Sequence, residues 1–208
     1  MGSNSSEKKG DNLPATDMTW IEAATFCNQL LEREGKEAAY TIKGNNVTCN
    51  WDAKGYRLPS EAEWEYEVRA PAAVTQGARA KDLSYAARGG KEHQYVGSDN
   101  LDEVAWYTGN SGGTIHPVGQ KKPNGFGLYD MSGNVCDWVL DFRVDKEYQN
   151  RDGVKDPKGP TNVSLTTSRG FHSGAYSEAI VNQQYSYRNG IDATYAKSYI
   201  GLRVVMLA

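Results

Sequence analysis

The fold of this chain is decided by the stretch NGFGLYDMSGNVCDW, residues 124–138. Chance composition does not supply such a combination, in which a turn rich in Gly and Asn leads into an acidic residue and a tryptophan. Two further stretches accompany it: YRLPSEAEWEY at residues 56–66 and GLRVV at residues 201–205. With 22 glycines and 13 tyrosines, the chain is predicted to be a loop-rich globular domain.

Length and charge narrow the class of protein. The 208 residues suffice for one large domain with a substantial core. The net charge is −3 and no run of lysine and arginine stands out, so nucleic acid is not an expected partner. No apolar run reaches the roughly 18 residues of a membrane helix, so no transmembrane segment is expected. We expect a monomer.

The beginning of the chain leaves the cellular compartment open. Residues 1–12 are polar, lack the apolar core of a signal peptide and are expected to be disordered. Met1-Gly2-Ser3 is typical of an added leader, so export or surface anchoring with the signal removed is one option. Order is expected from Leu13, in a single domain that spans residues 13–208.

The first third of the chain carries signals for a helix and a hairpin. Apolar side chains recur at helical spacing over residues 19–31, behind a capping box of Thr19 and Glu22, so a helix ending near Gly35 is predicted. Residues 40–51 contain two alternating runs joined by Gly-Asn-Asn, which predicts a β-hairpin.

A second helix is predicted next, and after it the sequence no longer shows helical periodicity. Ser60 and Glu63 form another capping box, which predicts a helix to about Arg69 with Trp64 buried. Residues 71–84 are mostly small and are interpreted as an insertion. Short strands and loops rich in Gly, Asn and Asp then continue to the end, so the fold class is α+β with little regular secondary structure.

These sequences resemble signatures of the formylglycine-generating enzyme family, also called the sulfatase-modifying factor family. Besides the three stretches above, VAWY at residues 104–107 and HPVG at residues 116–119 carry the likeness, which spans roughly residues 13–207. The resemblance implies a C-type-lectin-like fold. One departure is that the strand region preceding the first helix in the family is absent or truncated, which leaves the partner of the C-terminal strand open.

The resemblance also implies a structural calcium site inside residues 124–138. Carried over position by position, the ligands are the side chains of Asp130 and Asp137 and the backbone carbonyls of Gly133 and Val135. Oxygen ligands in a Gly-containing turn suit Ca²⁺. Asp137 is one methylene shorter than the Glu common at this position. The alternative is that these groups cap turns and bind backbone amides.

The cysteines differ from those of the catalytic members. In oxidases of this family, two cysteines in the region corresponding to residues 169–200 bind copper and the thiol substrate, as suits a soft metal. This chain has no cysteine after Cys136, so we expect neither copper nor that catalysis, and predict a protein that is not an enzyme. Cys27, Cys49 and Cys136 are expected to be small buried side chains, with a Cys27–Cys49 disulfide as the alternative in an exported protein.

Residues 169–200 are instead rich in tyrosine, serine, asparagine and small residues. Tyrosine offers broad contact area with few rotatable bonds, while Ser, Asn and Gly adapt their hydrogen bonds, as in an antibody paratope. The composition therefore predicts a ligand-binding surface. The residues expected to be exposed on it are Tyr176, Ser177, Glu178, Asn182, Tyr185, Tyr187, Asn189, Asp192, Thr194, Tyr195, Lys197 and Tyr199.

One branch of the family fits this description. The variable proteins of diversity-generating retroelements resemble formylglycine-generating-enzyme scaffolds whose C-terminal surface is hypermutated at adenine-containing codons. Asn codons changed in this way yield Tyr, Ser, Asp, Thr and several small residues, much of what lies between Ala175 and Tyr199. The resemblance implies a receptor-like protein with a hypervariable region at about residues 169–200 and a protein or cell-surface ligand.

Three alternatives remain open at this point. An ordinary family member with a Tyr-rich loop would show the same composition. A metal-dependent oxidoreductase could build its site from His116, His172 and a carboxylate instead of cysteines. A structural accessory subunit would need an apolar exposed face, which the mixture of Tyr, Ser and Asn does not obviously supply.

Overall fold

The structure is a computed structural model that describes residues 4–69, 93–144, 157–159 and 168–207. The predicted insertion at residues 71–84 lies outside these described residues. The regular elements in chain order are α1 (Trp20–Arg33), β1 (Tyr40–Lys43), β2 (Asn46–Cys49), β3 (Gly55–Arg57), α2 (Glu61–Val68), α3 (Leu101–Val104), β4 (Cys136–Phe142), β5 (Ser168–His172), the 3₁₀-helix η4 (Ile180–Gln183), β6 (Arg188–Asp192), β7 (Ile200–Leu202) and β8 (Val205–Leu207).

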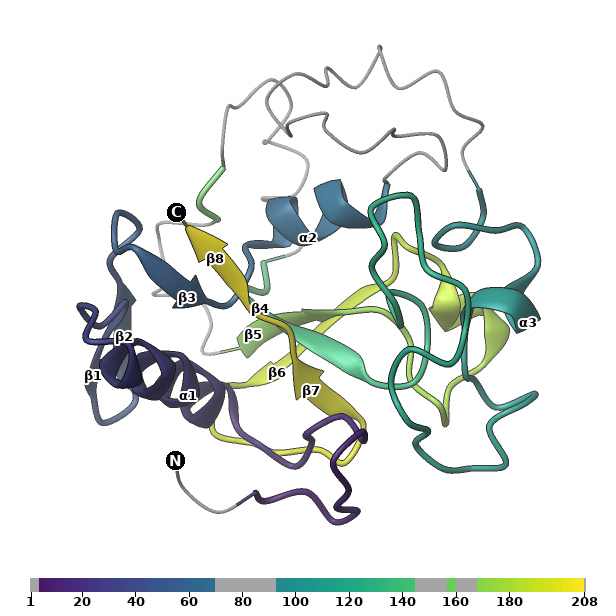
Figure 1. The fold of residues 1–208 in the computed structure, drawn as a ribbon, viewed down its shortest axis with the longest axis horizontal. Helices are drawn as coiled ribbons and strands as arrows, with labels where there is room; N and C mark the ends of the chain where they lie inside the picture. Colours follow the sequence, from purple (N-terminus) through teal and green to yellow (C-terminus); the bar gives the residue numbers. More distant parts are fainter. Residues whose placement is uncertain (1–3, 70–92, 145–156, 160–167, 208) are drawn as a thin grey trace.

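A four-stranded sheet with the order β6-β5-β4-β7 forms the centre of the domain (Figure 1). Strand β5 pairs antiparallel with β4 and β6, whereas β7 runs parallel to β4. The β1–β2 hairpin and a pair formed by β3 and β8 are the other sheets of the described residues. Strand β3 is therefore the partner of the C-terminal strand that the sequence left open.

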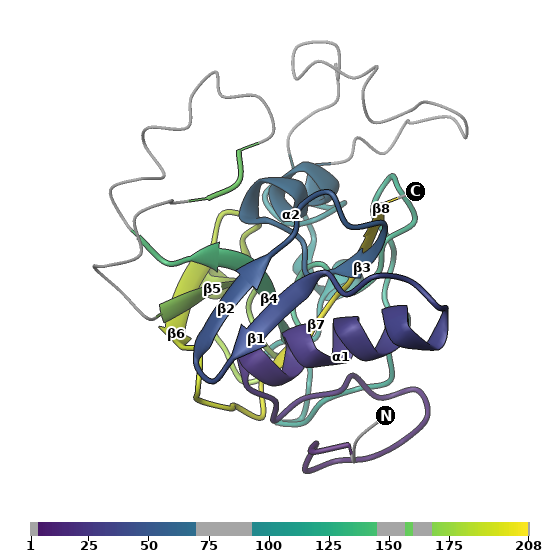
Figure 2. The same ribbon diagram turned by 90° about the vertical axis from the view of Figure 1, so that its left-hand side faces the viewer.

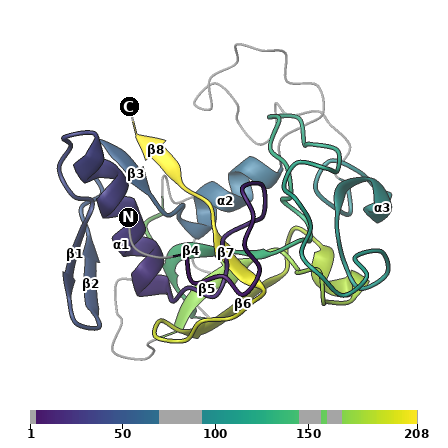
Figure 3. The same ribbon diagram turned by 60° about the horizontal axis from the view of Figure 1, so that its bottom comes forward.

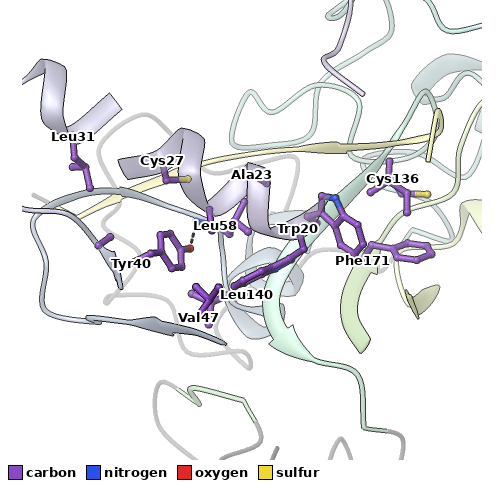
Figure 4. Close-up of a cluster of buried hydrophobic side chains, with 14 of the residues drawn as sticks. Trp20, Ala23, Cys27, Leu31, Tyr40, Val47, Leu58, Cys136, Leu140 and Phe171 are labelled. Carbon is purple, nitrogen blue, oxygen red and sulfur yellow. Dashed lines mark hydrogen bonds between the residues drawn. The ribbon is translucent and has the colours of Figure 1, made fainter. Parts of the chain in front are cut away.

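The side chains of β4 alternate between two hydrophobic cores. Cys136, Trp138 and Leu140 belong to the larger core, together with Trp20 of α1 (Figure 4). Val139 points the other way and packs in a smaller core against α2. Neighbouring residues of a strand face opposite sides of its sheet, and helices α1 and α2 lie on the two sides (Figure 2). Strand β4 is consequently buried on both faces.

Both long helices begin where the sequence predicts. In α1 the hydroxyl of Thr19 accepts a hydrogen bond from the Glu22 amide, and the Glu22 carboxylate accepts one from the Thr19 amide at 2.7 Å. Ser60 and Glu63 make the same reciprocal bonds at the start of α2. Gly35, just past α1, has a φ of 67°, the left-handed conformation that commonly ends a helix. Both helix predictions are confirmed.

Other local details differ from the predictions. The hairpin turn consists of two residues, Gly44-Asn45, because Asn46 already pairs with Lys43. The short helices α3 and η4 occur in a region where no helix was predicted. Each spans four residues, about one turn, which is too short to produce a detectable hydrophobic period.

Residues 4–12, which the composition predicts to be disordered, lie against the domain in the structure. Ser6 is buried, and its hydroxyl accepts a hydrogen bond from the Thr16 amide at 2.8 Å. The Val118 amide donates to the Asn12 carbonyl at 2.8 Å. The segment that follows runs beside β7 (Figure 3). The amino-acid composition of a segment does not reveal backbone contacts of this kind, so it could not predict that residues 4–12 pack against the domain. Among the described residues, no helix has the length and apolar character needed to cross a bilayer.

Candidate binding surface

The twelve predicted surface residues lie in the segment around η4, on β6 and in the loop between β6 and β7. The η4 segment is close to the loop that follows α3, at one end of the molecule (Figure 1). The side chains that are exposed are those of Ser177, Asn189, Thr194, Tyr195 and Lys197, and the other seven are half-buried. We call residues 176–182 and 187–197 the C-terminal surface.

Two of the predicted surface tyrosines contribute to the cores. Tyr185 packs against the smaller core, and the guanidinium carbon of Arg69 lies 5.2 Å from the centre of its ring. Tyr199 packs against the larger core, and its carbonyl accepts a hydrogen bond from the Cys136 amide at 2.8 Å. Composition cannot separate these roles, because tyrosine suits both a half-buried core position and a binding surface.

The exposed and the packed tyrosines should respond differently to substitution. Tyr195 is 59% exposed, so Tyr195→Ala is expected to change the free energy of unfolding by less than about 0.5 kcal/mol. Tyr199→Ala removes a ring that packs on the core and should lower it by roughly 1–3 kcal/mol. Urea denaturation of both variants measures the difference, and equal losses would show that the two positions are not distinct.

The backbone of the η4 segment is fixed by the scaffold around it. The Tyr176 amide donates to the Asn134 carbonyl at 2.9 Å, and the Ser111 hydroxyl donates to the Tyr176 carbonyl at 2.8 Å. Gly174 has no room for a side chain, since a Cβ atom there would lie 2.5 Å from the Asn182 carbonyl oxygen. A surface held in this way loses little conformational entropy when it binds a ligand.

A buried charged network lies beneath β6. His172 Nε2 is 2.9 Å from Glu61 Oε1, and Arg188 contacts both carboxylate oxygens of Glu61, with Nη2 2.9 Å from Oε2. The ring of Trp64 stacks on His172 with centroids 4.6 Å apart. Burial disfavours the ionised carboxylate, but His172 and Arg188 outweigh it and lower the pKa of Glu61 to about 2. The network thus anchors the first residue of β6 to α2.

Glu61, Glu65 and His172 are also the one group of three potential metal ligands found among the described residues, with ligand atoms within 4.8 Å of one another. This cluster was not found from the sequence, because His172 lies 111 residues along the chain from Glu61. The i,i+4 spacing of Glu61 and Glu65, which places both on one side of a helix, was the available signal. Arg188 already supplies positive charge to Glu61.

Within the part of the chain that the structure describes, His116 and His172 do not come together in one group of potential metal ligands. His116 is not a member of the group that contains His172. Its ring stacks on Trp106 at a centroid distance of 3.8 Å, and its Nε2 lies 2.8 Å from the Ser111 carbonyl oxygen. His116 lies in the loop after α3, whereas His172 lies in β5.

Three of the four predicted calcium ligands, Asp130, Val135 and Asp137, line one pocket of about 420 Å³. Asp130 Oδ2 accepts a hydrogen bond from the Gly119 amide at 2.7 Å, while its Oδ1 is buried with no hydrogen-bond partner among the described residues. Burial raises the pKa of Asp130, and the charge of Asp137 adds to the shift. A hard cation would satisfy this oxygen.

The other half of the pocket is less open to a cation. Asp137 Oδ2 accepts hydrogen bonds from Trp64 Nε1 at 3.0 Å and from Arg203 Nε at 3.2 Å, so a guanidinium already faces this carboxylate. Gly133 does not line the pocket. The donor set therefore fits Ca²⁺ at Asp130, whereas Asp137 would have to share its oxygens with Arg203.

Comparison with known proteins establishes the family. The model of the sulfatase-modifying factor enzyme 1-like domain matches residues 1–208. The chain belongs to the formylglycine-generating enzyme family. It is 33% identical over 240 residues to the Chaperone protein LppX of Paenibacillus barcinonensis, which covers 99% of this chain and 74% of LppX. Membership confirms the expected α+β, C-type-lectin-like fold.

Two further proteins, one compared by sequence and one by structure, are similar to this chain. The formylglycine-generating enzyme of Mus musculus is 28% identical over 182 residues, which cover 85% of this chain and 44% of the enzyme. Among solved structures, Treponema denticola variable protein 1 superposes with a TM-score of 0.75 at 27% identity, covering 98% of this chain and 74% of that protein.

The cysteines of this formylglycine-generating-enzyme scaffold are free. Cys27 and Cys136 are fully buried and Cys49 is half-buried, so the first two are core residues as expected and no Cys27–Cys49 disulfide is formed. Burial raises the pKa of Cys27 to about 12 and that of Cys136 well above its ordinary value. Both thiols stay protonated near neutral pH and are poor nucleophiles.

Proposed function

We propose that this protein is a receptor-like, non-catalytic member of the family, a variable protein of a diversity-generating retroelement that binds a protein or cell-surface ligand. The observation that carries the proposal is the Tyr-, Ser- and Asn-rich C-terminal surface on an anchored backbone, in a chain similar over 98% of its length to a structure named a variable protein. The chemistry of the surface is that of a paratope.

Exposed apolar side chains lie among the polar ones on the C-terminal surface. Ile180 is 50% and Val181 65% exposed, and Tyr195 on the β6–β7 loop is 59% exposed. Apolar and aromatic anchors surrounded by polar groups are the usual composition of a protein interface. The relative LppX is named a chaperone, and a polypeptide ligand fits that name as well.

The metal-dependent oxidoreductase has weaker support. Its site would use Glu61, Glu65 and His172, but His172 is 0% and Glu61 2% exposed. A catalytic metal needs an open position for substrate, and burial under β6 does not offer one. Iron or copper at stoichiometric level in the purified protein would nevertheless favour this alternative over the binding function.

The binding function is tested by selecting ligands from a random-peptide phage library on the immobilised protein. The affinity of the selected peptides is then measured for the wild type, for Tyr187→Ala/Tyr195→Ala and for Tyr129→Ala. Tyr129 is 41% exposed but lies outside the C-terminal surface, so it is a matched control. We expect the double variant to weaken binding at least about 100-fold, as for two interface anchors, and the control to leave it unchanged. Peptides that the double variant binds as well as the wild type does would refute the proposal.

A structural calcium ion at Asp130 is proposed as part of the same scaffold. Adding Ca²⁺ to chelator-treated protein at about 100 times its Kd should raise Tm by roughly 5–10 °C, because such binding contributes about 2.7 kcal/mol and 1 kcal/mol shifts Tm by about 2–4 °C at this size. Asp130→Ala, which removes both carboxylate oxygens, should abolish the shift. A melting curve that is the same with Ca²⁺ and with chelator would count against the site.

A further inference from the structure

The pocket that Asp130 lines also contains the carboxylate of Asp137 and the guanidinium of Arg203. The two carboxylates differ in their partners. Asp130 is 8% exposed, and its Oδ1 has no hydrogen-bond partner among the described residues. Asp137 is 3% exposed, and its Oδ2 accepts hydrogen bonds from Trp64 Nε1 at 3.0 Å and from Arg203 Nε at 3.2 Å. One carboxylate therefore keeps an unpartnered oxygen, whereas the other is already paired with a cation.

Two hydrogen bonds hold the guanidinium of Arg203 beside Asp137. Its Nε donates to Asp137, and its Nη2 donates to the Tyr129 carbonyl at 3.0 Å. Gly201 of β7 pairs with Asp137 of β4, so strand pairing also keeps Arg203 close to this carboxylate. The side chain of Arg203 is 29% exposed, and its charge is screened less than a charge on the open surface would be. The positive charge is thus a fixed part of the pocket.

A calcium ion in this pocket needs a carboxylate that Arg203 already uses. Ca²⁺ takes about six to eight oxygen ligands, and its affinity depends on how many of them are charged. To be bound by both Asp130 and Asp137, the ion has to share the Asp137 carboxylate with the guanidinium, and the two positive charges repel each other. Together the two carboxylates and Arg203 carry one negative charge, instead of the two that the ionised carboxylates alone would offer. The ion and Arg203 therefore compete for Asp137.

We propose that Arg203 determines the calcium affinity of this pocket, because it acts as an internal cation that occupies Asp137. This inference rests on the calcium ion proposed above and adds the residue that limits its binding. When Ca²⁺ binds, the hydrogen bond between Arg203 Nε and Asp137 weakens, while the Tyr129 carbonyl remains a partner for Nη2. Arg203 thus acts on the ion through a ligand that the two share.

Isothermal calorimetry with CaCl₂ as the probe tests this competition on the chelator-treated full chain. Arg203→Gln removes the positive charge and releases Asp137, so the Kd for Ca²⁺ should fall at least about tenfold. Arg203→Gln/Asp137→Asn restores the net charge of the pocket but removes the released carboxylate, and should lose most of this gain. Arg33→Gln is the matched control. It makes the same substitution at an exposed position of α1 that does not line the pocket, and should leave the Kd unchanged.

A measurement on the wild type keeps the test informative if Arg203→Gln does not fold. NMR of ¹⁵N-labelled protein follows the Nε–H signal of Arg203, which should shift as Ca²⁺ is added and the bond to Asp137 weakens. A signal that does not move at saturating Ca²⁺ would overturn the inference. So would an equal Kd in the wild type and in Arg203→Gln, or a gain in affinity that persists in the double variant.

The results also separate the role of Arg203 from the calcium site itself. If the wild type binds Ca²⁺ with the same Kd as Arg203→Gln, the calcium site stands and the role of Arg203 is wrong. If neither protein binds Ca²⁺, both are wrong. Binding by Arg203→Gln alone would support the competition in its strongest form. None of these results bears on the peptide selection, which probes the C-terminal surface.

Discussion

Glu61→Gln is expected to lower the free energy of unfolding by about 3–5 kcal/mol, the range found when one partner of a buried ion pair is removed. In the structure Glu61 contacts both Arg188 and His172. Glutamine keeps the size of the side chain but removes the negative charge that faces these two residues. Urea denaturation measures the loss. Glu32→Gln, exposed on α1, is the control and should change the value by less than about 0.5 kcal/mol.

Coupling between the partners separates this explanation from a simple packing defect. If the charge pair carries the effect, the double variant Glu61→Gln/Arg188→Gln loses clearly less stability than the sum of the two single variants. Strict additivity of the two losses would mean that Glu61 and Arg188 do not act together, and that the network does not anchor β6.

The lowered pKa of the Glu61 carboxylate predicts how the stability of the fold depends on pH. The pKa of Glu61 is lowered from 4.5 to about 2 in the folded protein, so its contribution is present above about pH 4.5 and is lost as the pH falls towards 2. The urea midpoint of the wild type should fall over this interval. That of Glu61→Gln should fall less, and parallel curves for the two proteins would contradict the assignment.

Gly133→Ala is the second substitution with a large expected effect, a loss of roughly 2–5 kcal/mol of unfolding free energy. Gly133 has a φ of 77°, and a Cβ atom there would lie 2.8 Å from the Trp106 amide nitrogen and still closer to the Trp106 carbonyl oxygen. The left-handed backbone costs about 1–2 kcal/mol for a residue with a Cβ, and overpacking adds about 1–3 kcal/mol.

Gly112 provides the matched control for this experiment. Its φ of 62° is also left-handed, but a Cβ atom there would meet nothing within 4 Å. Gly112→Ala should therefore show the conformational cost alone, about 1–2 kcal/mol. The difference between the two variants measures the close approach of the residue 133 turn to the loop after α3. Equal losses in urea denaturation would mean that this approach is not a constraint.

The parts of the fold that sequence reasoning found are those with local causes. The capping boxes at Thr19 and Ser60 place the helix starts, because all the interacting groups lie within three residues. The pairing of β3 with β8 joins residues about 150 positions apart, and no local pattern encodes it. The same holds for the hydrogen bonds that place residues 4–12 against the domain.

The candidate site was predictable in composition but not in geometry. The sequence identified the Tyr-rich region, yet it could not show that Tyr185 and Tyr199 pack against the cores. Nor did it pair Glu61 with His172, since these residues come from α2 and β5 and meet only in the folded chain. Ligand contact by the remaining surface residues stays a prediction.

The scaffold and the C-terminal surface have different tasks in this account. The sheet, its two cores and the network around Glu61 fix the backbone of β6 and of the η4 segment, and we propose that the exposed side chains that project from them differ among copies. Such a division explains how a formylglycine-generating-enzyme scaffold without the cysteine pair can serve recognition. It requires that variation among copies of this protein be confined to the C-terminal surface.

The most direct measurement is therefore to sequence the coding region for residues 165–205 in the source genome together with any nearby near-identical repeat. The account predicts a repeat that carries adenines wherever the two copies differ, beside a reverse transcriptase gene, with the differences at exposed positions such as Asn189 and Tyr195 and not at the buried positions His172 and Gln183. A single copy without such a repeat would contradict the assignment as a variable protein.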